Sequence, residues 1–573
     1  MKKTGYLLMF VLVACFCNQK ILAAIPLVEL IAKPNPTQFV KTQSSVLLFY
    51  TLRNNTSVGF PLSYLFSSNN ASLSNAGNTC GTFIGPNKTC QFTVQYQAPA
   101  ISITEKLIVQ VAYQGRAPVS DIVSINVDNN IACTLLNTAS YQTPFCQQQY
   151  QKVLQFTPGV FNTTNQNVQE EQTLGGIFGL YQNTGSTEQI CYISCGLRSL
   201  NGTPPNENTL FELASVTKTF TGSILGKFII NGTIASQFDE IRNYPHPAGL
   251  SFNVNEETVS FQQLATFSGG VCFSDAPSVN QSSTDQAVNQ MNFITDINAL
   301  NPDPNSGNCS NGAPNVRPVY ATPPFLPTHN FYSNSSVGLL GQSLIRIDGF
   351  ANVLEPDFNN WMCKNVTNPL DMIRTSACLP NEAHDGTCGT AAANCAYTAN
   401  WLTAEYASGY HLFQNSYQLG NPFPFLPWAP AGGIRSNASD MIKFIRANLG
   451  FNTGVHNPEQ AQLIQGMLMA HEPNIYFPFP GGTEPNIGNQ SPIRGGQGYA
   501  WVCMPSPPNG DRICGKIGGH KNFRSFLGLN KSKNYGLIIL FNTGALTTDG
   551  SLIPATKPPG ISQIGVNLLE NVN

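Results

Sequence analysis

The segment Phe211-Glu-Leu-Ala-Ser-Val-Thr-Lys-Thr-Phe220 places Ser215 and Lys218 three residues apart in a run that favours a helix. Residues at i and i+3 lie on one face of a helix, one turn apart, so the Lys218 amine can reach the Ser215 hydroxyl. A serine hydroxyl is a weak nucleophile until a neighbouring base takes its proton, and an amine held neutral by burial can do so. Apolar residues flank the pair, and a lysine drawn into an apolar helix needs a partner or a shifted pKa. The segment therefore predicts a catalytic serine, although a Ser-x-x-Lys pair by itself is more often a solvated helix face.

The length and composition of the chain set limits on what it can be. Its 573 residues exceed the usual size of one domain, so we expect two or more domains. Hydrophobic residues make up 42% and charged residues only 10%, with a formal net charge of −2. This is a globular composition that offers no basic patch for nucleic acid. The histidines are scattered, and neither C-x-x-C nor H-E-x-x-H occurs, so we expect no metal and no cofactor.

The first 24 residues have the pattern of an export signal. A basic start is followed by an apolar core over 6–17 and by small residues at the end of the segment. The core is too short to span a bilayer comfortably, and no later stretch predicts a transmembrane segment. We expect an exported protein, periplasmic or secreted. In the alternative, Leu12-Val-Ala-Cys15 is a lipoprotein box and an acylated Cys15 anchors the chain, but the apolar Phe16 favours the soluble form.

The cysteines also favour export. Two of the 16 lie in the signal, leaving an even 14, and cysteines in an oxidising compartment form disulfides. Segments 501–503 and 512–514 read as antiparallel strands on either side of a turn over 505–510. That arrangement predicts a disulfide between Cys503 and Cys514. In all, five pairs of cysteines are close neighbours in the sequence: Cys80/Cys90, Cys133/Cys146, Cys191/Cys195, Cys388/Cys395 and Cys503/Cys514.

Residues 25–130 have the pattern of a small β-sandwich. Short segments rich in β-branched and aromatic residues, such as 45–51, 90–96 and 107–113, are separated by turn signals. About 100 residues of this kind are typical of a two-sheet domain. The run Cys80-Gly-Thr-Phe-Ile-Gly-Pro-Asn-Lys-Thr-Cys90 resembles the Cys-bracketed hairpin of immunoglobulin-like modules on bacterial surface proteins. This resemblance implies a role in spacing or adhesion, with contact to the cell envelope.

Residues 131–170 are rich in Gln and Asn and are expected to be a linker. In the domain that follows, at 171–573, the sequence pattern changes to alternating strands and helices. Strands come first, helices lie between, and strands come last, which predicts one antiparallel sheet covered by helices. The fold class is therefore α+β, preceded by the all-β sandwich. The expected strands are 175–181, 190–196, 498–503, 523–529 and 535–542, and the expected helices, after the Ser215 segment, are 261–266, 336–347, 440–449 and 561–569.

Residues from about 170 to 570 resemble the serine β-lactamase and penicillin-binding-protein superfamily, most closely its class C β-lactamase and related esterase branch. Each motif is weak by itself, and their shared order makes the resemblance specific. The motifs are Thr209-Leu-Phe-Glu-Leu-Ala-Ser-Val-Thr-Lys-Thr-Phe220, Leu264-Ala-Thr-Phe-Ser-Gly-Gly270, Tyr332-Ser-Asn334, Pro369-Leu-Asp-Met372, Ala431-Gly-Gly-Ile-Arg-Ser-Asn-Ala-Ser-Asp440 and Lys516-Ile-Gly-Gly-His520.

The resemblance implies a role for each of five side chains. Ser215 attacks a carbonyl and forms an acyl-enzyme. Either Lys218 or Tyr332 accepts its proton, and Tyr332 can do so only if nearby cations lower its normal pKa of ~10. Lys218 and Lys516 are the available cations. Asn334 holds Lys218 and the substrate amide by hydrogen bonds.

The resemblance also implies an oxyanion hole made by the backbone N–H groups of Ser215 and Gly519. Each of the predicted site residues, taken alone, also has a non-catalytic interpretation. Tyr332 alone is more often a half-buried tyrosine, and Asn334 is also typical of a helix cap. Lys516 could end a hairpin, and His520 could be a surface histidine at a strand end.

Three positions depart from the family pattern. Ile517 replaces the threonine whose hydroxyl helps hold the carboxylate of β-lactams and peptidoglycan stems, which puts specificity for these substrates in doubt and leaves acyl transfer intact. Phe267 replaces the usual His, and Asp371 replaces the usual Gly. We expect the long segments 273–330 and 376–430 to reshape the rim of the pocket.

Two functions of different classes follow. The first is an exported serine hydrolase that acts through a Ser215 acyl-enzyme on a small-molecule or peptide substrate with an ester, amide or β-lactam carbonyl. The second is a non-catalytic surface or adhesion protein that keeps a penicillin-recognising scaffold for binding. The complete set of residues favours the enzyme, because a binding scaffold has no need of Lys218 beside Ser215.

Overall fold

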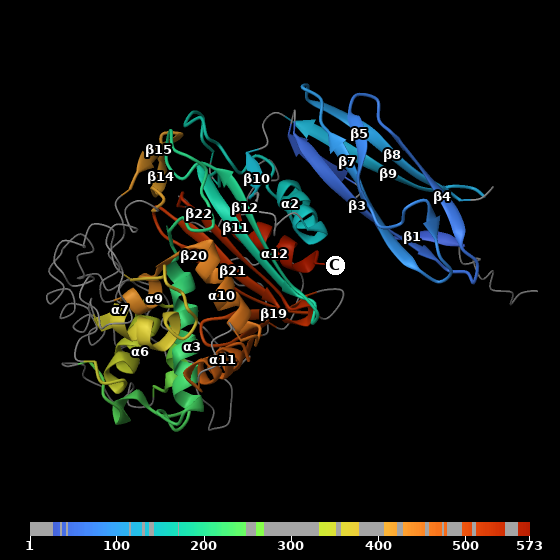
Figure 1. Cartoon of the computed structure of the whole chain (residues 1–573). Helices are drawn as coiled ribbons and strands as arrows, with labels where there is room; N and C mark the ends of the chain where they lie inside the picture. The colour runs from blue at the N-terminus through green and yellow to red at the C-terminus, as the bar shows by residue number, and fades with distance from the viewer. Residues whose placement is uncertain are drawn as a thin grey trace, which may run out of the picture. The chain divides into compact units, whose positions relative to one another are not determined.

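The chain folds into two compact units, Met1–Ile131 and Ala132–Asn573, in a computed structural model (Figure 1). The predicted export signal with Cys15, the Cys388/Cys395 neighbours, segment 273–330 and most of 376–430 lie outside the residues that the structure describes. Those residues are 27–34, 37–41, 44–113, 116–128, 132–136, 143–169, 171–247, 259–268, 332–350, 357–377, 406–420, 428–452, 458–472, 475–477, 495–506, 511–544 and 560–572. Within these ranges no helix is both long enough and apolar enough to cross a bilayer.

The first unit is the all-β sandwich that the sequence predicts. Side chains along its strands alternate between the core and the surface, as in the ten residues of Ser45–Asn54. A disulfide joins Cys80 to Cys90. One sheet has the order β1 (Val28–Ala32), β3 (Ser45–Asn54), β7 (Thr89–Gln97) and β5 (Ser72–Asn78). The other has the order β2 (Thr37–Lys41), β9 (Val119–Asp128), β8 (Ile103–Tyr113), β4 (Phe60–Ser67) and β6 (Phe83–Ile84).

The second unit is built on one antiparallel sheet of nine strands. Its central strands are buried on both faces, which requires helices on both sides of the sheet. The strand order is β10 (Cys133–Leu135), β12 (Glu188–Gly196), β11 (Gly175–Asn183), β22 (Tyr535–Phe541), β21 (Arg524–Asn530), β20 (Asp511–Gly519), β19 (Val502–Ser506), β18 (Gly495–Gln497) and β17 (Ile475–Phe477).

Helices cover the two faces of this sheet, and a hydrophobic core lies on each side (Figure 1). On one face lie α2 (Pro144–Phe156) and α12 (Ile561–Glu570). On the other lie α3 (Thr217–Ile230), α4 (Phe261–Ala265), α6 (Asn334–Ile347), α7 (Asp357–Met362), α9 (Ala429–Gly432), α10 (Ala438–Asn448) and α11 (Pro458–Ala470). The predicted α+β class, with helices over an antiparallel sheet, is confirmed.

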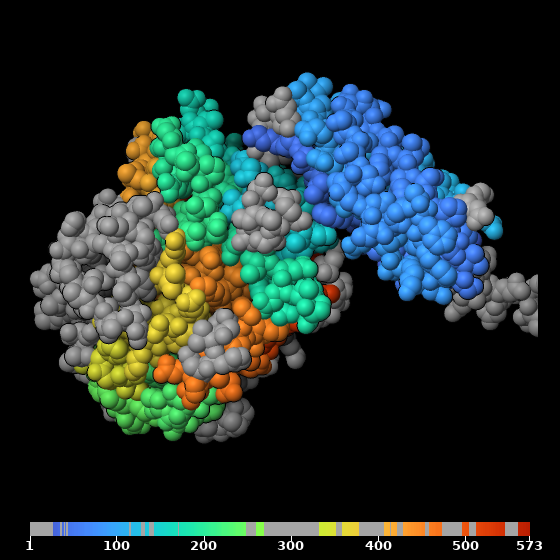
Figure 2. All heavy atoms as spheres, in the orientation of Figure 1, coloured from blue at the N-terminus to red at the C-terminus, as the bar shows by residue number. Residues whose placement is uncertain are grey.

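The helix that follows Ser215 is fixed in place by close packing. A side-chain carbon added at Gly226 of α3 would lie 2.2 Å from the carbonyl oxygen of Gly466 in α11, so both glycines are needed for this helix crossing. In the space-filling view of Figure 2, residues 332–350 and 357–377 (yellow) adjoin residues 428–452 and 458–472 (orange). These segments supply α6 and α9, which also pack on α3.

The prediction of a linker at 131–170 does not hold for the described residues 132–136 and 143–169, because they are part of the second unit. Its first strand, β10, pairs with β12, and α2 packs on the sheet through Phe145, Cys146 and Val153. Two disulfides fasten it, Cys133–Cys195 and Cys146–Cys191, so these neighbouring cysteines pair across the two segments. The many Gln and Asn residues of the segment make the short apolar face of α2 hard to recognise in the sequence.

Candidate active site

Ser215 lies in a tight turn at the start of the helix predicted from its sequence. The turn η2 (Ala214–Val216) precedes α3, and Ala214 has a φ of 47°, in the left-handed region that is costly for residues other than glycine. Two neighbouring segments hold the turn. The Leu213 N–H donates to the carbonyl oxygen of Ile434, and its own carbonyl accepts from the Ser525 hydroxyl at 2.6 Å. Ser215 is thus presented by a constrained backbone.

The Lys218 side chain is completely buried beside Ser215. Its Nζ donates to Ser215 Oγ at 2.9 Å, to Asn334 Oδ1 at 2.7 Å and to the carbonyl oxygen of Ala431 at 2.7 Å. A lysine ammonium has three N–H donors, and three acceptors surround it here. The structure therefore brings Lys218 and Asn334 together with Ser215.

Tyr332 also contacts Ser215. Its hydroxyl lies 2.5 Å from Ser215 Oγ and donates to Asn334 Oδ1 at 3.2 Å. Ser215 Oγ is consequently within hydrogen-bond distance of both groups that could take its proton. The residue directly after Tyr332 caps α6, because Ser333 accepts from the N–H of Ser336. The cap lies next to the Tyr-x-Asn motif and fixes the direction in which α6 leaves the site.

Lys516 adds a second cation next to Tyr332. Its Nζ lies 4.4 Å from the centre of the Tyr332 ring and 5.6 Å from that of Phe267. Lys218 Nζ lies 5.0 Å from the same Tyr332 ring centre. Two ammonium groups next to one phenol favour negative charge on its oxygen. Phe267 packs on Tyr332 with ring centres 5.1 Å apart, so the residue that replaces the family's histidine forms a wall of the site.

Gly518 brings β20 against the Ser215 turn. A side-chain carbon at Gly518 would lie 2.1 Å from the carbonyl oxygen of Leu213 and 3.1 Å from the nitrogen of Ser215, so only glycine fits there. Gly519 follows, and a carbon added to it would meet nothing within 4 Å. The strand carrying Gly519 therefore lies beside the backbone of Ser215, the arrangement that an oxyanion hole formed by these two residues needs.

Two of the departures from the family pattern have structural explanations. Asp371 has a φ of 57°, a conformation that favours glycine and that aspartate tolerates better than most residues. Ile517 pairs with Phe526 and packs against the core on the α12 side of the sheet, whereas Lys516 points toward Tyr332. The effect of a hydroxyl at position 517 on carboxylate recognition remains a prediction.

A buried polar cluster next to the site was missed by the sequence analysis. Glu212 in β13 (Phe211–Glu212) pairs with Arg435 in β16 (Arg435–Ser436), and its Oε1 accepts from the Tyr406 hydroxyl at 2.6 Å. His520 Nε2 lies 2.6 Å from Glu212 Oε2, a close electrostatic contact that falls short of an aligned hydrogen bond. Burial by itself would raise the pKa of Glu212, but the charges of His520 and Arg435 and the hydrogen bonds lower it to about 2. The His520 side chain is thus largely buried, with 8% of its surface exposed. Its position directly after Lys516-Ile-Gly-Gly519 was the signal that the sequence offered.

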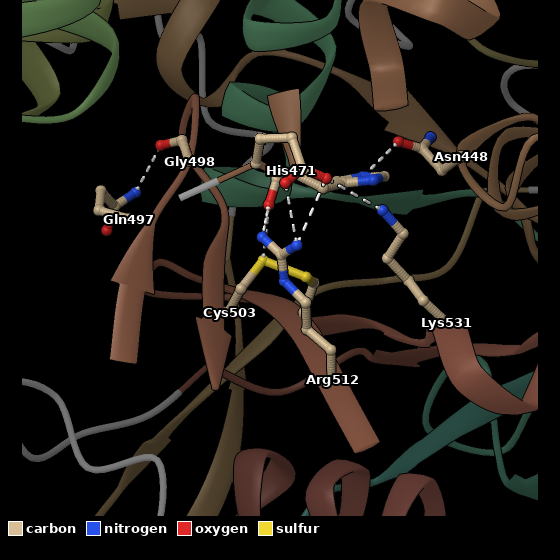
Figure 3. The surroundings of a disulfide bond; sticks show 9 residues. Asn448, His471, Gln497, Gly498, Cys503, Arg512 and Lys531 are labelled. Carbon is tan, nitrogen blue, oxygen red and sulfur yellow. Dashed lines mark hydrogen bonds and ion pairs between the residues drawn. A yellow bond between two sulfur atoms is a disulfide. The ribbon is translucent and has the colours of Figure 1, made fainter. Parts of the chain in front are cut away.

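The predicted disulfide between Cys503 and Cys514 is confirmed. The two residues lie opposite each other on β19 and β20, with Cα atoms 4.0 Å apart. Figure 3 shows Arg512 extending beside this bond toward His471, whose carbonyl oxygen accepts from the guanidinium. The bridge braces the strand that carries Lys516 two residues further on.

The class of protein follows from these observations. An antiparallel sheet covered by helices, with a serine in hydrogen-bond contact with a buried lysine and a tyrosine, is the arrangement of a serine hydrolase. The family model for beta-lactamases matches residues 164–555, and the chain belongs to this family. The protein is thus a serine hydrolase of the β-lactamase type, as predicted.

Similar proteins are β-lactamases. One relative, from Pseudomonas fluorescens, is 21% identical over 402 residues, which cover 67% of this chain and 92% of the relative. Another, from Lysobacter lactamgenus, is 22% identical over 360 residues, which cover 58% of this chain and 74% of the relative. A solved class C β-lactamase from Rhodobacter sphaeroides is 17% identical and covers 69% of this chain and 94% of its own, with a TM-score of 0.46.

Reduction of the Cys503–Cys514 bridge should lower activity before the protein unfolds. A disulfide typically stabilises a protein by about 2–4 kcal/mol, and this one also holds β20 against β19. Ester hydrolysis and tryptophan fluorescence would be followed together as the concentration of reductant rises. The Cys503→Ser/Cys514→Ser double variant, compared with the matched Cys80→Ser/Cys90→Ser variant of the first unit, assigns the effect. Loss of activity that coincides with unfolding in both variants would contradict this prediction.

Proposed function

We propose that this chain is an exported hydrolase that forms an acyl-enzyme on Ser215 with substrates that carry an ester, amide or β-lactam carbonyl. One observation carries the proposal: Ser215 Oγ lies 2.9 Å from Lys218 Nζ and 2.5 Å from Tyr332 Oη. A hydroxyl so placed can lose its proton as it attacks a carbonyl. The other residues predicted from the sequence, Asn334 and Lys516, adjoin the same groups.

In the proposed acylation step, Tyr332 is the group that takes the proton. In this proposal Lys218 stays an ammonium ion whose three N–H groups face Ser215 Oγ, Asn334 Oδ1 and the Ala431 carbonyl, and an ammonium has no free electron pair to accept a proton. Tyr332, flanked by the two lysine charges, can hold negative charge and receive the proton of Ser215. It then returns the proton to the leaving alcohol or amine. Water next attacks the acyl carbonyl, and the same phenol oxygen accepts its proton. That proton passes to Ser215 Oγ as the bond between the acyl carbon and Oγ breaks and the carboxylic acid leaves.

The N–H groups of Ser215 and Gly519 stabilise the oxyanion in this proposal. The contact of Gly518 with the Leu213–Ser215 backbone supports it, because it sets the spacing between the two donors. Lys516 is the cation closest to the nucleophile on this strand and would attract a substrate carboxylate. Since Ile517 offers no hydroxyl to share in that interaction, we propose that the enzyme depends less on a substrate carboxylate than its relatives do.

Export is supported by the disulfides and by the sequence of the first 24 residues. Cys80–Cys90, Cys133–Cys195, Cys146–Cys191 and Cys503–Cys514 are bridged within the described ranges, which is typical of proteins from oxidising compartments. We propose a periplasmic or secreted location, with the first unit as a spacer or as a contact to the cell envelope.

Replacing the nucleophile should abolish catalysis and leave the fold intact. For Ser215→Ala we expect hydrolysis of p-nitrophenyl butyrate and of a chromogenic cephalosporin to fall by several orders of magnitude, because no oxygen remains to form the acyl-enzyme. Ser223→Ala is the matched control, since Ser223 lies in α3 and its hydroxyl bonds only within the helix, to the Thr219 carbonyl. If the Ser215→Ala variant hydrolysed these substrates as fast as the Ser223→Ala control, the assignment of Ser215 as the nucleophile would be refuted.

The choice of base has its own test. Tyr332→Phe keeps the ring between the two lysines and removes only the oxygen, so acylation should slow by about 10²–10⁴-fold, the usual contribution of a general base. Stopped-flow acylation by an activated ester would measure this step directly, and circular dichroism would check the fold. If acylation were nearly unchanged, Lys218 would have to be the base.

A further inference from the structure

The cluster around Glu212 joins two elements that carry the proposed oxyanion donors. Glu212 precedes Ser215 by three residues on β13, and His520 directly follows Gly519 at the end of β20. The carboxylate of Glu212 is fully buried and contacts His520 through Oε2 and the Tyr406 hydroxyl through Oε1. One buried carboxylate thus connects the segment that leads to the nucleophile with the strand end that leads to the second donor.

The hydrogen bonds around His520 identify which ring nitrogen carries the proton. The backbone N–H of Asn522 donates to His520 Nδ1 at 3.2 Å, so Nδ1 is an acceptor. The proton of the neutral ring then lies on Nε2, which faces Glu212. A second bond, from the His520 N–H to the Phe523 carbonyl at 3.1 Å, closes the same turn. His520 therefore binds its own turn with one nitrogen and the Glu212 segment with the other.

The charged groups of the cluster determine which side chains contact the Glu212 carboxylate. Arg435 already neutralises Glu212, with Nη2 3.3 Å from Oε1, and the side chains of both are buried. His520 adds a second polar contact, to the other oxygen of the same carboxylate. When one side chain of such a buried cluster is removed, the polar groups that it contacted lose their partner. The backbone then shifts to reduce the free-energy cost of these unsatisfied groups.

We infer that His520, held by Glu212, is a positioning residue that fixes the Gly519 N–H relative to the Ser215 N–H in the oxyanion hole. This inference rests on the proposed function, because it assigns a support to the donors of that same site. The physical reason is that backbone donors stabilise an oxyanion only when they are held at the correct distance from it, and loss of one donor typically costs 10²–10³-fold in rate. His520 touches neither Ser215 nor, in this assignment, the substrate.

Two substitutions separate the two contacts of His520. Gln places an amide N–H near the position of Nε2 and keeps the contact to Glu212, whereas Asn keeps only an acceptor near the position of Nδ1. We expect His520→Asn to lower kcat and kcat/KM equally, by about 10–100-fold, since a transition-state interaction is weakened. His520→Gln should stay within about threefold of wild type. Glu188→Gln is the control, because Glu188 forms an ion pair with Arg446 through a different part of the sheet.

A pair of substrates distinguishes a displaced oxyanion hole from general damage. Rates would be measured for an aryl ester and for the matching thionoester, in which sulfur replaces the carbonyl oxygen, and active enzyme would be counted by titration with a fluorophosphonate. The oxygen-to-sulfur rate ratio is independent of the amount of active enzyme. It should fall in His520→Asn and remain at the wild-type value in His520→Gln and Glu188→Gln.

The inference is overturned if His520→Asn keeps the wild-type kcat and rate ratio, or if His520→Gln loses as much as His520→Asn. It is also overturned if kcat falls with no change in the ratio. Glu212→Gln would be measured as well, but the two His520 variants decide the matter even if that protein fails to fold. Labelling of Ser215 by the fluorophosphonate tests the proposed function separately, so either idea can fail without the other.

Discussion

Burial of the Lys218 ammonium is the constraint on which the active site depends. A charged amine removed from water is stable only when other acceptors replace that water. Here the acceptors are Ser215 Oγ, Asn334 Oδ1 and the carbonyl of Ala431, the last two 116 and 213 residues away along the chain. Three segments must therefore meet at one point for the charge to be tolerated. Their meeting also places the Tyr332 hydroxyl within hydrogen-bond distance of Ser215 Oγ.

A second set of contacts positions the sheet against this point. Gly518 lets β20 touch the backbone of the Ser215 turn, and the Ser525 hydroxyl binds the carbonyl of Leu213 from the neighbouring strand. The buried Glu212 adds contacts to Arg435, Tyr406 and His520. The helix side and the strand side of the site are thus fastened independently. This arrangement suits a reaction in which negative charge moves from one oxygen atom to another, because the groups that stabilise the charge must stay at fixed distances from these atoms.

The sequence predicted what depends on short separations. Ser215 and Lys218 are one helical turn apart, and Cys503 and Cys514 flank one hairpin, so local geometry decides both pairs. Contacts between distant segments were accessible only through the resemblance to a family, as with Tyr332. Neither the periodicity of the sequence nor a motif predicted features that are particular to this chain, such as the contact of His520 with Glu212. The segment 131–170 was misread for a related reason, because its partners on the sheet follow it by tens of residues.

The central claim is that Ser215 carries the acyl group, and one measurement tests it most directly. The intact protein would be mixed with a slowly hydrolysed penicillin and, separately, with an activated ester, quenched in acid and analysed by mass spectrometry after digestion. The account predicts one acyl adduct per chain from each reagent, located on Ser215, in the peptide that contains residues 209–220. An adduct on another residue, or turnover of the ester with no covalent intermediate trapped on Ser215, would contradict it.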